Sequence, residues 1–572
     1  MQFPPSSPHE PSFTSADPLH RVPGDWGQHN LTPSGKDPYR PAWAWRIGLA
    51  VISLSLLTAV VFIQRPAAPE PGRAAKAASG LTEEFSPAIE STLIAKVYFG
   101  MRSLMTSDPS FPKMMQESLD SAAGFPTSRP GPIGIDPPAP KEGSSPPPAI
   151  SRLHAGVMAG ETLGPEEALS RLDKAEPQIA AESPLQGDLA IMRRVYGGEP
   201  AAEVAASLSD QEREEFLGRH GLFGGLVLSY GEEKAPVRID AASSGQIMVL
   251  SMFAFGGAAI LAGFIGLGLL ITLCVLMAQG KLHARFMVPR PYAAAHEGPT
   301  SWGWGMDPQG RLIWLETVAV FMAGFLILGV SGDVLNAQYP NAAWVAFYSL
   351  LGQWVLVLTL FWPVVRGMPW QRWRGDLGWH RGEGFWKEVG AGLMAYLASL
   401  PIYFVAAILV AIYIVIRSAL SGQDAAPAAE DNKLLDLAMS GNPVVIVMIF
   451  LLATLWAPVV EESVFRGALY RHWRGMFAYL FARIGSPAAA GGIDSGASRL
   501  FSILFASFFT AIVFAVMHGY AVIQLLMVGV LGFVFALMRE WRGSLIAPMT
   551  AHFTHNTIVL TFVIILFGQL AK

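Results

Sequence analysis

The sequence predicts an all-α polytopic membrane protein with about nine transmembrane helices and a helical extramembrane segment after the first. Three observations favour this fold class. Of the 572 residues, 52% are hydrophobic and 15% are charged, whereas soluble proteins carry about 25% charged residues. Apolar runs long enough to cross a bilayer follow one another. Lysine and arginine gather in alternate loops between these runs.

The charge and cysteine content exclude several classes of protein. Forty Lys and Arg residues stand against 44 Asp and Glu, and the resulting net charge of −4 provides no positive field for binding nucleic acid. The single cysteine, Cys274, cannot form an internal disulfide or a cysteine-based zinc site. Any metal ion would therefore need histidine and carboxylate ligands.

The amino-terminal part of the chain divides into three segments. Residues 1–42 are rich in Pro, Ser, Asp and His, which predicts a disordered tail. The first long apolar run predicts a transmembrane anchor over 43–64. Residues 65–245 are more polar, and we expect an extramembrane helical segment with a Pro-rich linker over 108–151. The capping-box pattern Ser209–Glu212 predicts a helix start. No catalytic signature occurs in this segment, which favours a small helical domain or a spacer.

The rest of the chain consists of apolar runs, each with the roughly 20 residues that a helix needs to cross the hydrocarbon. The predicted spans are 247–278, 312–331, 342–365, 386–416, 443–464, 500–518, 521–538 and 545–568. The basic residues of alternate loops are Lys281, Arg285 and Arg290, then Arg366, Arg372, Arg374 and Arg381, then Arg471, Arg474 and Arg483, then Arg539 and Arg542. The positive-inside rule places these loops and the amino terminus inside, and 65–245 outside.

Ionisable side chains within spanning helices cost roughly 2.5 to 3.5 kcal/mol each on insertion scales, so each one calls for a partner or a function. The first cluster is Glu461-Glu462-Ser463-Val464-Phe465-Arg466, which follows Pro458. Glu462 and Arg466 are four residues apart with the acid first, the favourable order for an ion pair on one helical face. Glu461 points about 100° away from that face, so it is the carboxylate left for chemistry.

Two further clusters occur in later helices. Phe514 and His518 are four residues apart near the end of one apolar helix. His552 and Asn556 are four residues apart in the last helix, where His555 either faces the same cavity or packs between helices. A single membrane histidine is usually a packing residue. Two carboxylates, two imidazoles, an amide and a guanidinium in one bundle are hard to explain by packing, because each unpaired group would be destabilising.

These three clusters resemble the motifs of the CAAX-protease and bacteriocin-processing (CPBP or Abi) family of intramembrane peptidases, which includes CAAX prenyl protease 2. The motifs are Glu-Glu-x-x-x-Arg, Phe-x-x-x-His and His-x-x-x-Asn, on successive helices. They stand here at Glu461–Arg466, Phe514–His518 and His552–Asn556. The resemblance covers about 375–570, so the helices over 246–366 are additional to the common core.

The resemblance implies an endopeptidase that hydrolyses a peptide bond with an activated water. It implies that Glu461 is the general base, with His518 as its partner at the water. His552 and Asn556 would stabilise the oxyanion. The substrate would be a membrane-associated protein or peptide, reached within the lipid bilayer.

The same resemblance assigns supporting roles to Glu462, Arg466 and Phe514, which would hold the helix and the base in place. It implies no cofactor. Two alternatives stay open. Glu461, His518 and His552 could instead form a zinc site of the His₂Glu kind, although no His-Glu-x-x-His motif occurs. The polar cluster could also belong to an immunity-type scaffold or a transporter that performs no cleavage.

Overall fold

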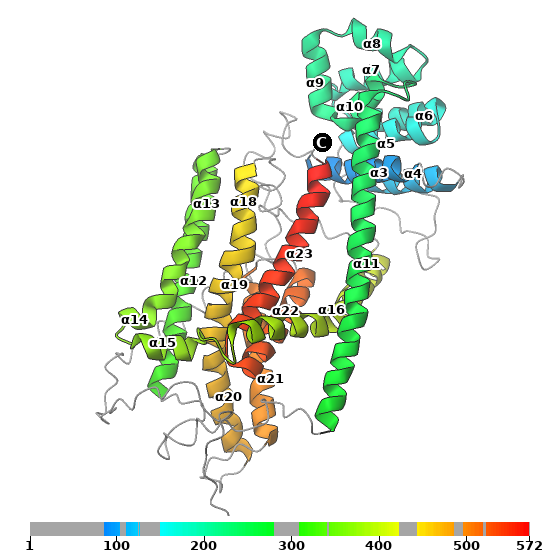
Figure 1. Cartoon of the computed structure of the whole chain (residues 1–572). Helices are drawn as coiled ribbons and strands as arrows, with labels where there is room; N and C mark the ends of the chain where they lie inside the picture. Colours follow the sequence, from blue (N-terminus) through cyan, green and yellow to red (C-terminus); the bar gives the residue numbers. More distant parts are fainter. Residues whose placement is uncertain are drawn as a thin grey trace, which may run out of the picture.

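The computed structural model describes residues 85–102, 110–123, 125, 149–279, 308–339, 342–421, 443–485, 496–518 and 522–570. Within these ranges the chain is helical and contains no β-strand, which confirms the all-α fold class. Long helices form a bundle, and a group of shorter helices lies at one end of it (Figure 1). The tail predicted over 1–42 and the anchor predicted over 43–64 lie outside the described residues. Of the linker predicted over 108–151, residues 108–109, 124 and 126–148 also lie outside them, and the rest belongs mainly to α4 and α5.

The group of short helices forms a domain with its own core. None of these helices is among the apolar spans, so we expect the domain to lie outside the membrane and call it the extramembrane domain. Its helices are α3 (Phe85–Arg102), α4 (Ser110–Ala122), α5 (Ala149–Thr162), α6 (Pro165–Ala175), α7 (Leu185–Tyr196), α8 (Ala201–Ser207), α9 (Asp210–His220) and α10 (Leu222–Leu228). Helix α5 lies at the centre, because Leu153, Val157 and Met158 are fully buried against its neighbours. The predicted capping box is confirmed, since Ser209 Oγ accepts from the Glu212 amide while the Glu212 carboxylate accepts from the Ser209 amide.

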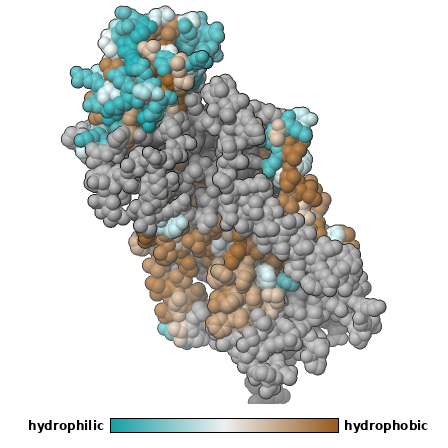
Figure 2. Space-filling view, turned by 180° about the vertical axis from the view of Figure 1, so that it is seen from behind, coloured by the Kyte–Doolittle hydropathy of each residue, from teal (hydrophilic) through white to brown (hydrophobic). Residues whose placement is uncertain are grey.

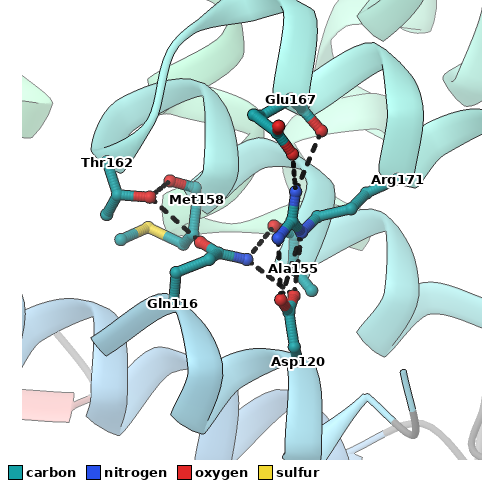
Figure 3. Close-up of polar contacts among 7 residues, drawn as sticks. All are labelled: Gln116, Asp120, Ala155, Met158, Thr162, Glu167 and Arg171. Atoms are coloured by element: carbon teal, nitrogen blue, oxygen red, sulfur yellow. Dashed lines mark hydrogen bonds and ion pairs between the residues drawn. The ribbon is translucent and has the colours of Figure 1, made fainter. Parts of the chain in front are cut away.

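Polar side chains join three helices of this domain (Figure 3). Arg171 of α6 donates to both carboxylate oxygens of Asp120 on α4 and to Glu167 one turn earlier on its own helix. Gln116 of α4 donates to Asp120 at 2.8 Å and to the Ala155 carbonyl of α5 at 3.0 Å. Because Gln116 and Asp120 are almost fully buried, these bonds satisfy groups that would otherwise be costly inside the domain.

The bundle contains the remaining helices. They are α11 (Pro236–Ala278), α12 (Pro308–Gln338), α13 (Ala343–Val355), η4 (Leu356–Phe361), α14 (Trp362–Val365), α15 (Trp370–Leu377), α16 (Phe385–Ser421), α18 (Pro443–Leu451), η5 (Leu452–Trp456), α19 (Ala457–Glu461), η6 (Glu462–Leu469), α20 (Tyr470–Gly485), α21 (Gly496–Val516), α22 (Val522–Arg542) and α23 (Ile546–Leu570). On the face seen in Figure 2, the described surface of the bundle is mostly apolar, whereas that of the extramembrane domain is mostly hydrophilic. Phe253 and Phe264 of α11, for example, are 66% and 69% exposed, as expected of side chains that face lipid.

Seven segments of the described residues are long and apolar enough to cross a membrane. They are Pro236–Leu276, Ile313–Gln338, Phe347–Val365, Phe385–Ile416, Pro443–Phe477, Arg499–Val516 and Ile546–Leu566. The predicted count of nine is therefore not confirmed. The predicted span over 521–538 corresponds to helix α22, which is not among the seven and carries Arg539, Glu540 and Arg542 in its last turns.

Helix α11 connects the extramembrane domain to the bundle. It packs against α3 near its start and against α16 and α23 further along. At the crossing with α3, a side chain on Gly100 or Gly245 would collide with the backbone of the other helix, so glycine permits this close approach. Helix α3 also contacts the end of α23, where Lys96 Nζ donates to the Gln569 carbonyl at 2.5 Å. The domain is thus joined to two helices of the bundle.

Candidate active site

The first motif lies in an irregular part of its helix. Segment η5 is π-helical, so the Ala457 N–H donates to the carbonyl five residues back, at Leu452. In this register the carbonyl of Ala453 would pair with residue 458, but Pro458 has no N–H. Asn556 of α23 donates from Nδ2 to the Ala453 carbonyl at 2.8 Å. The third motif therefore satisfies a carbonyl that Pro458 leaves without a helical donor, and this bond fixes α23 against the first motif.

Glu462 lies at the centre of the cluster. One of its carboxylate oxygens accepts from Arg466 at 2.9 Å, and both side chains are completely buried. The same oxygen accepts from Nδ1 of His552, also at 2.9 Å. A carboxylate accepts hydrogen bonds only, so Nδ1 of His552 carries the proton and its Nε2 is directed elsewhere. The structure thus brings Glu462 to His552 as well as to Arg466.

Aromatic rings surround the guanidinium of Arg466. Its central carbon lies 4.2 Å from the centroid of Phe514 and 5.3 Å from that of Phe535. One of its nitrogens also donates to the Gly532 carbonyl at 3.0 Å. A side chain on Gly532 would press against Phe514 and Arg466, so glycine allows α22 to approach this closely. Cation–π contacts and hydrogen bonds together compensate the buried charge.

The second carboxylate faces the other nitrogen of His552. Nε2 of His552 lies 3.9 Å from Oε2 of Glu461. Oε2 of Glu461 is buried and has no hydrogen-bond partner among the described residues, although the side chain as a whole is 17% exposed. Arg466, Glu462, His552 and Glu461 therefore form one chain, and Glu461 has the most exposed side chain of the four.

His518 lies beside Phe514. Its ring centroid is 4.6 Å from that of Phe514, and the centroid of His552 is 6.1 Å from the same ring. Nδ1 of His518 donates to the Phe514 carbonyl at 2.8 Å. The rings of His518 and His552 thus both contact Phe514, and Nε2 of His552 lies close to Glu461.

His555 packs between helices. Its Nδ1 lies 3.3 Å from the Tyr396 hydroxyl, and its ring contacts the rings of Tyr396 and Tyr403 on α16. Of the two possibilities left open from the sequence, the structure favours the packing role. This contact helps to fix the rotation of α23 about its axis, and therefore the direction in which His552 points.

The alternative zinc site would use Glu461, His518 and His552 as its ligands. No group of three or more His, Cys, Asp or Glu side chains in the described ranges lies close enough to hold a metal ion. Glu461, His518 and His552 are therefore not such a group. Metal dependence stays a question for experiment.

Sequence reasoning missed three residues around the cluster. Phe535 stacks on His552 with ring centroids 5.4 Å apart, and Gly532 accepts from Arg466. Trp379 donates from its indole to Ser463, the neighbour of Glu462, at 2.8 Å. Phenylalanine and glycine are common in apolar helices, and Trp379 comes before the first motif by about eighty positions. No local pattern could therefore have identified them.

Comparison with known proteins bears on this geometry. Residues 443–558 match the family model described as type II CAAX prenyl endopeptidase Rce1-like. This segment is Rce1-like. The match contains all three motifs and confirms the family resemblance drawn from them, over a shorter range than the predicted 375–570. No curated protein and no solved structure matches the chain.

The Rce1-like match supports an intramembrane CAAX-type endopeptidase at the level of the family. Together with the seven apolar helices, it makes the chain an integral, multi-pass membrane protein. The extramembrane domain and helices α11 to α16 lie outside the matched residues, so the family model gives no role for them.

Proposed function

We propose that this protein is a glutamate-dependent intramembrane endopeptidase that cleaves a membrane-associated protein or peptide by activating a water. The observation that carries the proposal is the buried chain Arg466–Glu462–His552, which ends 3.9 Å from Glu461. Such a chain fixes the tautomer and orientation of an imidazole beside a carboxylate that can take a proton. The Rce1-like match of the same residues supports this reaction class.

In the proposed reaction, Glu461 takes a proton from a water while the water oxygen attacks the carbonyl carbon of the scissile bond. His518 is the partner of Glu461 at the water. The resulting tetrahedral intermediate collapses, the carbon–nitrogen bond breaks, and the proton held by Glu461 passes to the leaving amine. Both atoms and charge balance, and no further reactant is needed.

His552 and Asn556 stabilise the negative oxygen of the intermediate. Glu462 holds Nδ1–H of His552, so the imidazole donates from Nε2 when both nitrogens are protonated. Asn556 uses one N–H on the Ala453 carbonyl, and its amide carries a second. Removing one such donor from an oxyanion site costs about 10²- to 10³-fold in rate.

The experiment compares the peptide termini of membranes that contain wild-type protein, Glu461→Gln or Glu316→Gln. Glu316 is a matched control, because it is another buried carboxylate of the bundle and contacts Arg366 rather than His552. We expect new termini with wild-type protein and with Glu316→Gln, and their loss with Glu461→Gln. Termini that persist in Glu461→Gln at an equal level of folded protein would refute the proposal and favour the scaffold or transporter.

Metal dependence is decided with the same termini. Treatment of the membranes with a zinc chelator leaves cleavage unchanged if Glu461 activates the water alone. Loss of cleavage that added zinc restores would instead establish the metal-dependent variant, with Glu461, His518 and His552 as the donors to substitute first.

A further inference from the structure

A short segment at the end of α15, Leu377–His380, contacts both the helix of Glu462 and the helix of His552. Gly378 follows the last residue of α15 and has a φ of +99°. This left-handed conformation favours glycine, which ends the helix and turns the chain. The segment lies outside the residues that match the family model, so the family gives no role for it. We call Leu377–His380 the brace segment.

The brace segment contacts η6 at two points. Nε1 of Trp379 donates to the Ser463 hydroxyl at 2.8 Å, and that hydroxyl donates to the Val459 carbonyl at 2.6 Å. Ser463 is completely buried, so losing either bond would leave a buried polar group unsatisfied. One turn later, a side chain on Gly467 would collide with Leu377. Glycine therefore lets the end of α15 approach η6 closely.

The brace segment also holds the start of α23, the helix of the third motif. The Leu545 amide donates to the Gly378 carbonyl at 3.0 Å, and the Ser544 hydroxyl donates to the His380 carbonyl at 2.8 Å. Both donor residues are buried. The segment is thus bonded to the helix of each partner in the 2.9 Å hydrogen bond between the first and third motifs.

The bond to Ser463 lies where the helix of the first motif changes its register. At the end of α19 the Glu462 N–H donates to the Val459 carbonyl, three residues back, whereas η6 is π-helical. A wider turn rotates each successive side chain by a smaller angle, so the place of this change determines where Glu461 and Glu462 point. The Ser463 hydroxyl donates to the same Val459 carbonyl. The Trp379 bond therefore fixes the helix directly beside the two carboxylates.

We propose that Trp379 is a positioning residue, which acts through Ser463 to hold Glu462 at hydrogen-bonding distance from His552 and to direct Glu461 toward the same imidazole. The inference rests on the proposed function, since these side chains would perform the reaction. Trp379 needs no contact with substrate in this role. Loss of one such hydrogen bond changes a conformational equilibrium by about 3- to 10-fold, which sets the size of the expected effects.

Two variants remove the bond, and each has a matched control. Trp379→Phe removes the donor and Ser463→Ala removes the acceptor. Trp373→Phe is the control for the first, because Trp373 packs on the Trp379 ring but its indole donates to a backbone carbonyl of η4. Thr317→Val is the control for the second, because Thr317 of α12 is equally buried and its hydroxyl also donates to the carbonyl one turn earlier.

The bond between Glu462 and His552 can be followed without any cleavage. The full chain, with isotope-labelled histidine, is placed in phosphatidylcholine nanodiscs, and exchange of the Nδ1 proton of His552 with solvent is measured by NMR. The signal is identified by its loss in His552→Gln. We expect exchange to be about 3- to 10-fold faster in Trp379→Phe and in Ser463→Ala, and unchanged in both controls. The His220 proton bonded to a carboxylate of the extramembrane domain is the internal reference.

Cleavage tests whether this positioning matters for the reaction. The peptide termini that Glu461→Gln abolishes should appear about 3- to 10-fold more slowly, per folded molecule, in Trp379→Phe and in Ser463→Ala. They should appear at the wild-type rate in both controls. The double variant should be no slower than either single variant, because both changes remove the same bond.

Unchanged proton exchange in Trp379→Phe and Ser463→Ala would overturn the proposal. Faster exchange with unchanged cleavage, equal losses of cleavage in the controls, or effects that add in the double variant would also overturn it, because each assigns Trp379 a purely structural role. A wild-type protein without any termini that depend on Glu461 would instead refute the proposed function. The exchange measurement would still decide whether Trp379 positions the pair.

Discussion

A buried chain of histidine, carboxylate and arginine occurs in the extramembrane domain as well as in the membrane bundle. In the domain, Asp188 accepts from His220 at 3.1 Å and from Nε and Nη2 of Arg219 at 2.8 Å each. In the bundle, Glu462 accepts from His552 and Arg466 at 2.9 Å each. In both regions one carboxylate accepts from an imidazole and from a guanidinium, although the imidazole uses Nε2 in His220 and Nδ1 in His552.

The two chains differ in what lies beyond the histidine. Nδ1 of His220 faces Nε2 of His154 at 3.2 Å, and the His154 ring stacks on Phe223. His154 is 2% exposed, and its remaining nitrogen has no partner among the described residues. Nε2 of His552 instead faces the carboxylate of Glu461, whose side chain is 17% exposed.

This difference separates a structural use of the pattern from a chemical one. In the domain the chain ends at the ring of His154, which is buried against Phe223 and is not accessible to a substrate. In the bundle it ends at a second carboxylate, which is partly exposed and can take up a proton. A buried His–acid–Arg chain by itself therefore does not indicate catalysis. The group on the far side of the imidazole distinguishes a structural chain from a chemical one.

The largest expected effect comes from neutralising Glu462, the carboxylate of the chain in the bundle. Glu462→Gln should lower cleavage by about 10²- to 10⁴-fold, because an amide no longer fixes the tautomer of His552. It should also lower the free energy of unfolding, by about 3 to 5 kcal/mol if Arg466 is left buried and unpaired. Appearance of the new peptide termini, normalised to folded protein, measures the first effect.

Asp188→Asn is the control for this prediction, since it makes the same chemical change in the other chain. Cleavage per folded molecule should stay at the wild-type level. Cleavage that falls equally in both variants would contradict the division into a structural and a chemical chain.

A smaller effect concerns the pH dependence of the extramembrane domain. Burial, and secondly the charge of nearby His220, hold the pKa of His154 well below its ordinary value. The unfolded chain binds a proton at this residue below about pH 6.5, whereas the folded domain does not. The stability gained from a neutral His154 is therefore present above that pH and is lost as the pH falls, by up to about 1.4 kcal/mol per pH unit.

Urea-dependent proteolysis of the domain within the full chain, between pH 5 and 7.5, measures this slope. His154→Gln supplies the comparison, because its amide can still donate to His220 but does not titrate. The slope should decrease in the variant. An identical slope in both proteins would show that other groups cause the acid sensitivity.

The smallest effect concerns the start of α9. Ser209→Ala removes the side-chain half of the capping box and should lower the stability of the domain by about 1 kcal/mol. Ser118→Ala is the matched control, because Ser118 is exposed within α4 and bonds only the Met114 carbonyl one turn earlier. It should leave stability nearly unchanged. Both variants should cleave as the wild type does, and a loss of cleavage in either would link the domain surface to the reaction.

Local pattern predicted much of this molecule. Hydropathy predicted the helical class and most of the spans, and the spacing of Glu462 and Arg466 placed the two on one face because i and i+4 residues are neighbours on any helix. The capping box at Ser209 was predictable for the same reason, since it depends on four consecutive residues. Such features need only the geometry of one element.

The contacts between elements were not predictable in the same way. The hydrogen bond between Glu462 and His552 joins residues ninety positions apart. The bond from Asn556 to Ala453 depends on a π-helical turn, which shifts the unpaired carbonyl by one residue from its α-helical position. Whether His555 faced the cavity or packed against Tyr396 depended on the rotation of α23, which is set by neighbouring helices.

Helix α11 runs for 43 residues without an internal proline, a length of about 65 Å at 1.5 Å per residue. It crosses α3 at the Gly100–Gly245 contact and then lies along α23, whose far end is held by Lys96. The domain is therefore attached to α11 and, through Lys96, to α23, the helix that carries His552. A rotation of the domain relative to the bundle would break one of these two contacts. The orientation of the domain and the position of α23 are thus coupled.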